Sequence, residues 1–431
     1  MKNPLKKLLI FMFLFGLIFA MTACSGAGEK ANSEKGGDKS GKATIRMAVF
    51  ENDPNGMMEK ARQKFNKEHD KINLEFTQMS NDASQMHDQT VTQLSAKSKN
   101  LDIVNMDVVW TAEFAESGWL APLDDKFTED LQSKYISRQV DSVKYNDKTW
   151  AVPWFNDLHP LWYRKDLLEK YNQKVPETYE EAVKVAQLIS KKEGIQGFTM
   201  HWGRSEQLIV SFTEFLHAAG GDFFDKDGKV TINSPEAVKA LQFMVDMMNK
   251  DKVVSPSAIG YSTPEDSRIP FTQGQALFNP NWGYVYSLNQ ADDSPVKDKT
   301  WVASNFKFEG GKKANSVGGW NFAISNSSEH KDEAWEVIKW FTSAENQKEM
   351  LVGGGYAGTQ LALYDDADVI KANPYLEEYT KVFEEASIRP THPQYSKMSD
   401  KAQSYIHQAL SGDVSPKEAL DKLAKELENM K

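Results

Sequence analysis

The chain has 431 residues, of which 40% are hydrophobic, and carries a formal net charge of −10 at pH 7. This length indicates two or three units, each with a core of its own. The acidic balance argues against nucleic acid as a partner and against broad adsorption to anionic lipid, because both need concentrated lysine and arginine. A single cysteine, Cys24, excludes a disulfide within one chain.

The N-terminus has the pattern of an export signal. Three lysines within the first seven residues precede an uncharged run, residues 8–21, that is rich in Leu, Ile and Phe. A helix that crosses a bilayer needs about 20 apolar residues, so this run is short for a permanent anchor. We therefore predict that residues 1–23 are a signal peptide that is removed.

The sequence around the cysteine predicts how the protein is held after export. Residues 21–24, Met-Thr-Ala-Cys, resemble a lipobox, in which the cysteine thiol receives diacylglycerol and becomes the new N-terminus. We therefore predict lipid attachment at Cys24. Residues 24–42 lack large apolar side chains and are predicted to form a flexible tether. The alternative is a secreted protein with one unpaired thiol.

The body opens with alternating strand and helix patterns. Strand-like runs at 44–50 and 72–76 flank a helical pattern, and a second helical pattern leads into a strand at 101–106. This alternation favours a parallel sheet covered by helices on both faces. Ligands of such sheets bind beyond the C-terminal ends of the strands, and Asp107 lies at one of those ends.

The second half is predicted to be richer in helices. A short strand at 149–154 precedes longer helices, so a second lobe is predicted to start there. Residues 225–228 are predicted to form a hairpin turn and not a calcium loop, because a third oxygen ligand and the distal glutamate are absent. The other predicted elements are helices at 179–191, 206–219, 235–250, 335–342 and 347–351 and a strand at 321–325.

Catalytic signatures are absent from the sequence. It contains no G-x-S-x-G, H-E-x-x-H, Walker or C-x-x-C motif. The eight histidines show no ligand spacing, and most fall in helical or loop patterns that predict solvated or capping roles. Gly318-Gly319 and 353–355 lack the Lys-Ser/Thr of a phosphate loop, so close backbone approach or hinge bending is predicted there. We predict no catalytic residue, no metal and no cofactor.

Aromatic side chains stand beside carboxylates and amides in three segments, 105–110, 153–157 and 278–284, each predicted to be a loop at a strand end. Sugars demand this combination, because the C–H face of a pyranose lies on an indole while its hydroxyls donate to ionised acceptors. A single tryptophan beside a polar residue is more often a core residue. The clustering of three such segments favours a carbohydrate site.

Eight segments carry a resemblance to a known family: 101–110, 118–123, 151–157, 161–167, 220–223, 233–237, 274–277 and 318–324. Through them, nearly the whole chain after Cys24 resembles an extracellular solute-binding protein of a bacterial ABC importer, of the carbohydrate group that includes maltose and trehalose binders. The resemblance implies an α/β, two-lobe, type II periplasmic-binding-protein fold with discontinuous lobes and a three-segment hinge. It implies that the chain passes from one lobe to the other at three places, near Pro153, near Gly319 and at 364–372. The implied N-terminal lobe is 43–153 plus 321–366, and the C-terminal lobe is 154–320 plus 367–431.

The resemblance also implies the sugar-binding residues. Trp282 and Trp320 would stack on the sugar, Arg389 would donate to its oxygens, and the carboxylates would hold its hydroxyls. The alternatives are that Arg389 forms an ion pair at the surface and that Glu51 is the N-cap of the following helix. The implied contacts are Glu51, Asp107, Asp157, Trp282, Gly319, Trp320 and Arg389, with Trp154, Phe155 and Tyr356 as secondary candidates.

These observations predict a lipid-anchored, monomeric binding protein that captures a disaccharide or short oligosaccharide and delivers it to a membrane permease. It is not predicted to be an enzyme. One alternative is a non-sugar solute such as a polyamine or glycerol phosphate. The other is a glycoside hydrolase, since paired carboxylates with aromatic stacking also describe those enzymes.

Overall fold

The βαβ alternation predicted from residue 44 onward is present in the structure, a computed structural model that describes residues 41–53, 55–383, 386–390 and 392–430. The first elements are β1 (Ala43–Phe50), α1 (Met57–Glu68), β2 (Ile72–Met79), α2 (Ala83–Ser95) and β3 (Ile103–Asp107). β1 pairs in parallel with both β2 and β3, as the alternation predicted. The predicted signal peptide, Cys24 and most of the tether lie outside the described residues and stay predictions.

The larger sheet is mixed and not wholly parallel. It has the order β12-β11-β3-β1-β2, and β6 also pairs with β11. β11 (Asn315–Ile324) runs antiparallel to β3 and to β6 (Ala151–Leu158), and β12 (Ala386–Ile388) joins it in parallel. The antiparallel partner of β3 is about 200 residues away in sequence, so local periodicity gave no sign of it.

The loop predicted at 153–157 is wrong, because these residues form the middle of β6. Residues 151–156 are all buried, so the strand lacks the alternation of a half-exposed strand. The strand predicted at 149–154 overlaps the first half of β6 and includes Pro153, which lacks the N–H that a ladder needs. Pro153 stands where the pairing of β6 with β11 shifts register, an irregularity that tolerates proline.

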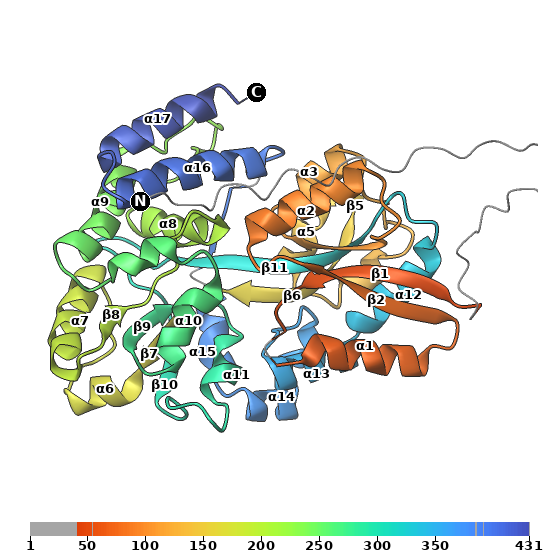
Figure 1. Ribbon diagram of the computed structural model, residues 1–431, viewed down its shortest axis with the longest axis horizontal. Coiled ribbons are helices and arrows are strands. Elements are labelled where there is room, and N and C mark those ends of the chain that lie inside the picture. Colours follow the sequence, from red (N-terminus) through yellow and green to blue (C-terminus); the bar gives the residue numbers. More distant parts are fainter. Residues whose placement is uncertain (1–40, 54, 384–385, 391, 431) are drawn as a thin grey trace, which may run out of the picture. The chain divides into compact units, whose positions relative to one another are not determined.

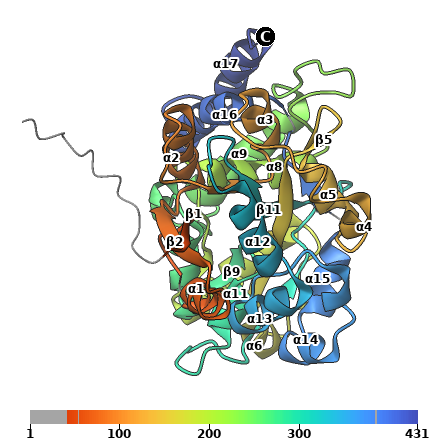
Figure 2. The ribbon, with the colours of Figure 1, turned by 90° about the vertical axis from the view of Figure 1, so that its right-hand side faces the viewer.

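Helices cover both faces of this sheet. α2, α3 (Thr111–Glu116) and α5 (Ser137–Ser142) lie above β1 and β11 in Figure 1, while α1 and α13 (Ala344–Gly354) lie below. α12 (Lys331–Phe341) packs beside α1, and Figure 2 views this group from the side. We call the apolar cluster around the sheet the first core. It includes Phe65, Met86, Met106, Phe114 and Ile338, each fully buried.

A second sheet has the order β10 (Thr300–Ala303), β7 (Leu161–Arg164), β9 (Ala276–Pro280) and β8 (Gln196–Phe198). The three long helices predicted next to it are present as α7 (Tyr179–Glu193), α8 (Glu206–Ala218) and α9 (Pro235–Asn249). Their ends follow local chemistry: Thr178 and Glu181 form a capping box at the start of α7, and Gly194, with φ of 69°, ends it.

The second core packs between this sheet and its helices, and it contains Phe212, Leu241, Phe278 and Ile406. α16 (Tyr395–Leu410) and α17 (Pro416–Glu428) complete it against α8 and α9.

The predicted turn at 225–228 is confirmed, because the Asp225 N–H donates to the Lys229 carbonyl at 2.9 Å. The remaining elements are α4 (Glu129–Gln132), β4 (Lys144–Tyr145), β5 (Lys148–Thr149), α6 (Lys165–Lys170), the 3₁₀ turns η1 (Pro256–Gly260) and η2 (Leu361–Leu363), α10 (Pro264–Thr272), α11 (Val285–Asn289), α14 (Ala367–Ala372) and α15 (Leu376–Val382).

β6 and β11 reach beyond the first core. Leu158 at the end of β6 and Val317 in β11 belong to a third apolar cluster with Trp162 and Tyr379. Figure 1 shows β11 running from the elements of one core to those of the other. The lobe boundaries predicted at 153/154, 320/321 and 366/367 stay predictions. In the described part of the chain, none of the helices has the length and apolar character that crossing a bilayer requires.

Candidate functional site

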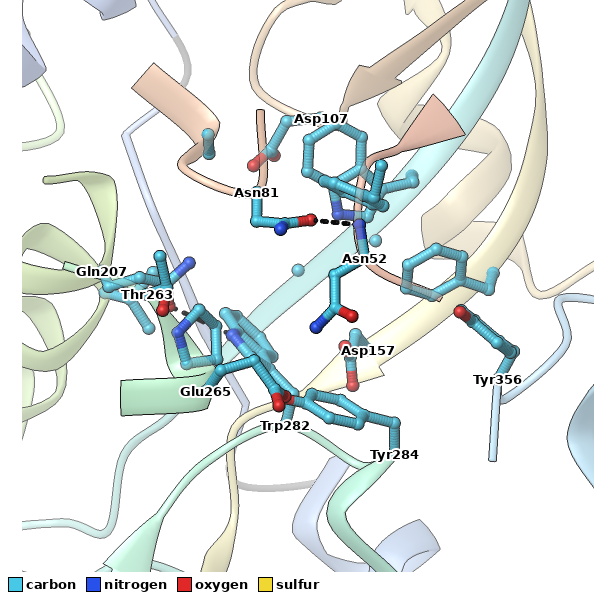
Figure 3. A pocket seen from close by; sticks show the side chains of 18 of the residues that line it. Asn52, Asn81, Asp107, Asp157, Gln207, Thr263, Glu265, Trp282, Tyr284 and Tyr356 are labelled. Atoms are coloured by element: carbon cyan, nitrogen blue, oxygen red, sulfur yellow. Dashed lines mark hydrogen bonds between the residues drawn. The ribbon is translucent and has the colours of Figure 1, made fainter. Parts of the chain in front are cut away.

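A cavity lies where β1 and β3 end beside the middle of β6 and β11, facing the starts of α8 and α10 and the loop after β9 (Figure 3). Eight of the residues implied by the family resemblance line it together. They come from six separate stretches of the sequence, so the fold and not local sequence brings them to one place. They are Asp107, Phe155, Asp157, Trp282, Gly319, Trp320, Tyr356 and Arg389.

Glu51 and Trp154 are not among the lining residues. Glu51 is exposed just after β1. At the start of α1 the Met57 N–H donates to Asp53 Oδ1 at 3.0 Å, so the side chain that accepts there is Asp53 and not Glu51, and the N-cap alternative for Glu51 is wrong. Trp154 is 2% exposed and stacks on Phe322 with ring centroids 4.6 Å apart. The neighbours Asn52 and Phe155 line the cavity instead.

Arg389 is buried in an ion triad at one end of the cavity. Its Nη2 donates to Asp107 Oδ1 at 2.7 Å, and its Nη1 donates to Asp107 Oδ2 at 3.2 Å and to Glu206 Oε1 at 2.7 Å. The side chain is 2% exposed, so the alternative of a surface ion pair is wrong. Such a buried triad has fixed geometry, because every charge in it depends on the others for compensation.

Asp157 faces the cavity from β6. Its Oδ1 accepts from the Gly283 N–H at 3.0 Å and from the Tyr379 hydroxyl at 3.2 Å. Burial nevertheless raises the pKa of Asp157 to about 7, because these hydrogen bonds do not replace the lost hydration of the carboxylate. The two donors fix Oδ1, and the backbone N–H of Leu158 also donates to the same carboxyl.

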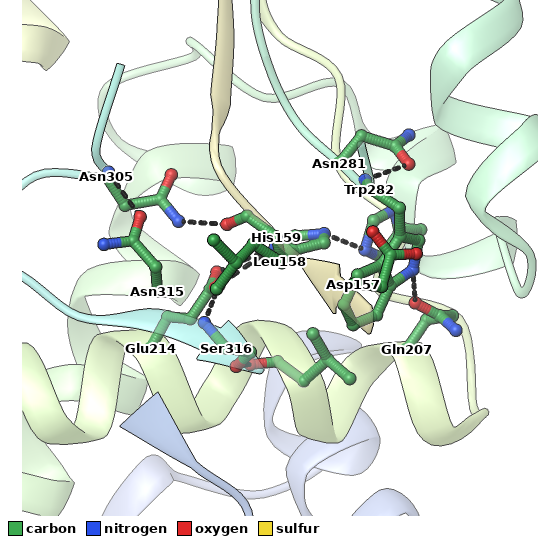
Figure 4. Close-up of polar contacts among 12 residues, drawn as sticks. Asp157, Leu158, His159, Gln207, Glu214, Asn281, Trp282, Asn305, Asn315 and Ser316 are labelled. Atoms are coloured by element: carbon green, nitrogen blue, oxygen red, sulfur yellow. Dashed lines mark hydrogen bonds and ion pairs between the residues drawn. The ribbon is translucent and has the colours of Figure 1, made fainter. Parts of the chain in front are cut away.

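The Trp282 indole is held on three sides (Figure 4). Its Nε1 donates to Gln207 Oε1 at 3.1 Å, and the His159 ring meets it edge-on at 4.8 Å. A Cβ on Gly318 would lie 3.0 Å from the indole, so only glycine lets the backbone of β11 approach this closely. The close approach predicted for this glycine pair is confirmed. The orientation of Trp282 is therefore set before any solute arrives.

Two histidines behind Trp282 contradict the predicted solvated or capping role. His159 and His201 are both 0% exposed, and their Nε2 atoms lie 3.1 Å apart. His159 Nδ1 lies 3.0 Å from Glu214 Oε1, and His201 Nδ1 lies 2.9 Å from the Ser267 hydroxyl. Burial lowers the pKa of His159 to about 3 and holds that of His201 well below its usual range. The pair is thus neutral and supports the indole.

Several lining residues were not predicted from the sequence. Glu265 accepts from Arg268 Nε at 2.9 Å and from the Tyr284 hydroxyl. These residues stand in the first turns of helices or in the segments just before them, where polar side chains usually serve as caps, and that pattern concealed them. For Asn52 and Asn81 the available signal was their position after predicted strands, and for Tyr284 it was the aromatic segment 278–284; Gln207, Thr263 and Glu265 had no such signal. The missed residues are Asn52, Asn81, Gln207, Thr263, Glu265 and Tyr284.

Within the described residues, no cluster of three or more His, Cys, Asp or Glu side chains is arranged to hold a metal ion. What the cavity offers is two fixed indoles, Trp282 and Trp320, and several carboxylates and amides. This set can stack on an apolar face and bind hydroxyls.

Residues 50–348 match the family of bacterial extracellular solute-binding proteins. The chain belongs to this family. The solute-binding protein is 31% identical over 349 residues to a probable ABC transporter-binding protein of Deinococcus radiodurans, a match that covers 79% of this chain and 82% of the relative. It is 24% identical over 450 residues to the arabinooligosaccharide-binding protein of Bacillus subtilis, covering 99% of each.

Among solved structures, the solute-binding protein is similar to the maltose-bound MalE3 of T. maritima, with 37% identity and a TM-score of 0.87 over 90% of this chain and 99% of that one. The predicted type II fold, with two discontinuous α/β lobes joined by a hinge, is confirmed by this similarity. These relatives are solute-binding proteins and not enzymes. The solute-binding protein therefore serves an ABC transporter on the outer side of the membrane.

Proposed function

We propose that the protein captures a neutral carbohydrate, a disaccharide or short oligosaccharide, in this cavity and delivers it to the permease of an ABC importer. The observation that carries the proposal is that Trp282 and Trp320 line the same cavity as Asp107 and Asp157. Two separate indoles suit a ligand with more than one ring, and the carboxylates suit its hydroxyls. The relatives named for maltose and arabinooligosaccharide add support.

The charges in the cavity favour a neutral solute. Asp107 is paired with Arg389, and Glu265 is paired with Arg268 Nη2 at 2.5 Å. Burial raises the pKa of Asp157, the third carboxyl of the cavity, to about 7, so none of the three offers a full uncommitted negative charge to a polyamine at pH 7. Arg389, the one cation among the lining residues that the structure describes, is already shared by two carboxylates. A glycerol phosphate would find no uncommitted cation there.

A ligand screen tests this proposal against its alternatives. Thermal unfolding and calorimetry should detect maltose, maltotriose or an arabinooligosaccharide, and should give no response with spermidine or glycerol phosphate. Binding of either charged solute in place of the sugars would overturn the proposal. Incubation with labelled maltose should return unchanged sugar, whereas turnover would favour a hydrolase.

Trp282→Ala is expected to weaken sugar binding by about 1–3 kcal/mol, because the apolar face that stacks on the sugar is lost. Isothermal calorimetry measures the loss. Trp340→Ala is the matched control, since Trp340 lies on α12 and does not line the cavity. It should leave the affinity unchanged, and equal losses in both variants would contradict the role of Trp282.

We further propose that Cys24 carries lipid and that residues 24–42 tether the body to the membrane. About 18 flexible residues span on the order of 20–25 Å, which keeps the receptor near its permease. Cys24→Ala should therefore shift the protein from the membrane fraction to the medium while calorimetry gives the wild-type sugar affinity. Retention of the variant in the membrane fraction would contradict the anchor, and a lost affinity would mean that the N-terminus takes part in recognition.

The proposed mechanism is closure of the lobes around the sugar. With lobes at 43–153 plus 321–366 and at 154–320 plus 367–431, Asp107 belongs to one lobe and Trp282 and Arg389 to the other. A ligand shifts an open–closed equilibrium only through its better affinity for one state, and contacts from both lobes supply that difference. The protein is proposed to act as a monomer.

A further inference from the structure

Glu206, the first residue of α8, does not line the cavity but holds the arginine that does. Its Oε1 accepts from Arg389 Nη1 at 2.7 Å and from the Tyr395 hydroxyl. Its Oε2 accepts from the Ser399 hydroxyl. Tyr395 and Ser399 lie one turn apart on α16, and Glu206 is 6% exposed. Three donors from two segments therefore fix this carboxylate in a place that water hardly reaches.

The two carboxylates that share Arg389 belong to different cores. Asp107 ends β3, next to Met106 of the first core, whereas Leu208 of α8 and Tyr395 of α16 are part of the second core. Arg389 follows β12, which lies beside α8. In the proposed separation of the lobes, Arg389 and Glu206 stay together in the lobe 154–320 plus 367–431, and Asp107 moves away with the other lobe. Glu206 is then the partner that keeps Arg389 compensated and aimed at the position to which Asp107 returns.

The charge balance of the triad points to a second effect on Asp107. Arg389 alone with Asp107 would form a neutral pair, and the guanidinium would satisfy both oxygens of the carboxylate. Because Nη1 is divided between Asp107 Oδ2 at 3.2 Å and Glu206 Oε1 at 2.7 Å, the longer bond falls to Asp107. With this bond lengthened, Asp107 Oδ2 keeps acceptor capacity for a ligand hydroxyl.

The connections of α16 extend this arrangement back to the other side of the cavity. Gln403 Nε2 donates to the Ser399 hydroxyl at 2.9 Å and to the Ser84 hydroxyl of α2 at 3.2 Å. One turn further along α2, His87 Nε2 lies 2.9 Å from the Ser396 hydroxyl of α16. The helix that fixes Glu206 thus also touches the elements that carry Asp107.

We propose that Glu206 is a positioning residue for solute recognition, which acts through Arg389 to place Asp107 and to keep acceptor capacity on its Oδ2. The inference rests on the proposed capture of a sugar by this cavity. A different role is available to Glu206, since an acidic residue in the first turn of a helix also stabilises that helix. The two roles can be distinguished, because stabilisation of the start of α8 by Glu206 does not depend on Arg389, whereas the proposed effect on sugar affinity does.

The test is a double-mutant cycle in sugar affinity with Glu206→Gln, Arg389→Lys and the double variant, measured by calorimetry with maltose, or with the tightest sugar of the ligand screen if maltose gives no heat. Each single variant should lose at least tenfold in affinity. The sugar affinity of the double variant should lie within about twofold of that of the weaker-binding single variant, because the effects of coupled residues do not add. Losses that multiply, or a Glu206→Gln protein with wild-type affinity, would overturn the inference.

Two further measurements keep the outcome clear. If Glu206→Gln does not fold, a variant with Tyr395→Phe and Ser399→Ala removes two of the donors to Glu206 and should lose at least threefold in affinity, and wild-type affinity in it would overturn the inference. A role confined to the helix would lower the unfolding midpoint and leave the affinity of the folded protein unchanged. If the wild type binds no sugar at all, the proposed function fails with it, whereas sugar binding that is insensitive to Glu206 overturns this inference alone.

Discussion

Replacing Arg389 by methionine is expected to abolish measurable sugar binding and to lower the free energy of unfolding by about 3–5 kcal/mol. The variant leaves Asp107, 5% exposed, and Glu206, 6% exposed, as two buried carboxylates without their shared cation. Methionine fills much of the volume of arginine, so the loss reports charge and not an empty space. Urea denaturation at pH 7 and calorimetry with the same protein measure the two effects.

Arg204→Met is the matched control for this loss. Arg204 also pairs with a carboxylate, Asp400, at 3.0 Å, but the two side chains are 54% and 63% exposed. Exposed ion pairs contribute about 0–1 kcal/mol, so the unfolding midpoint should barely move and sugar binding should be retained. An Arg389→Met protein as stable as the Arg204 variant would mean that the triad is not buried in solution.

Asp157→Asn should stabilise the protein at pH 8 by about 2–4 kcal/mol and leave its stability nearly unchanged at pH 4. Burial raises the pKa of this carboxyl from 3.8 to about 7, so the folded protein keeps a proton that the unfolded chain has released. The contribution of Asp157 to stability is therefore fully present below pH 3.8 and is lost as the pH rises through about 7. An asparagine Oδ1 still accepts from Gly283 and Tyr379 and carries no charge.

Urea denaturation of both proteins at pH values from 4 to 8 checks this prediction. Asp141→Asn, an exposed aspartate on α5, is the control and should show no such pH-dependent gain. At pH 8, where Asp157 is ionised, the same change removes an ionised acceptor from the cavity, so sugar affinity should fall there although stability rises. A difference between variant and wild type that is constant from pH 4 to pH 8 would contradict the raised pKa.

Part of the fold followed directly from local pattern. The strands and helices up to β3 were predicted because apolar residues such as Phe65 and Leu74 recur with clear periods, and the helix ends at Thr178 and Gly194 carry their own chemistry. Only the first half of β6 was predicted, as part of the strand at 149–154, because its burial on both faces removes the period that would have extended the strand to Leu158. The pairing of β11 with three different strands joins distant segments and leaves no local trace.

The residues of the site were also predicted only in part. Asp107 was found from its place at the end of a strand, and Arg389 and Gly319 came only from the family resemblance. Glu206 and Glu265 were missed, because an acidic residue in the first turn of a helix has an ordinary explanation. The burial of His159 could not be predicted, since nothing in its immediate sequence separates a buried histidine from a solvated one.

The pairing of β6 with β11 has a consequence for the release of the solute. Phe155, Asp157, Gly318, Gly319 and Trp320 all belong to these two strands, which pair from the first core to the third cluster with one register shift between Trp320 and Asn321. With the proposed lobe boundaries all five residues fall in the lobe 154–320 plus 367–431, so this surface of the cavity stays together in the proposed separation of the lobes. We expect a sugar that rests on it to keep one orientation relative to this lobe from capture to release, and so to be presented to the proposed permease in one way.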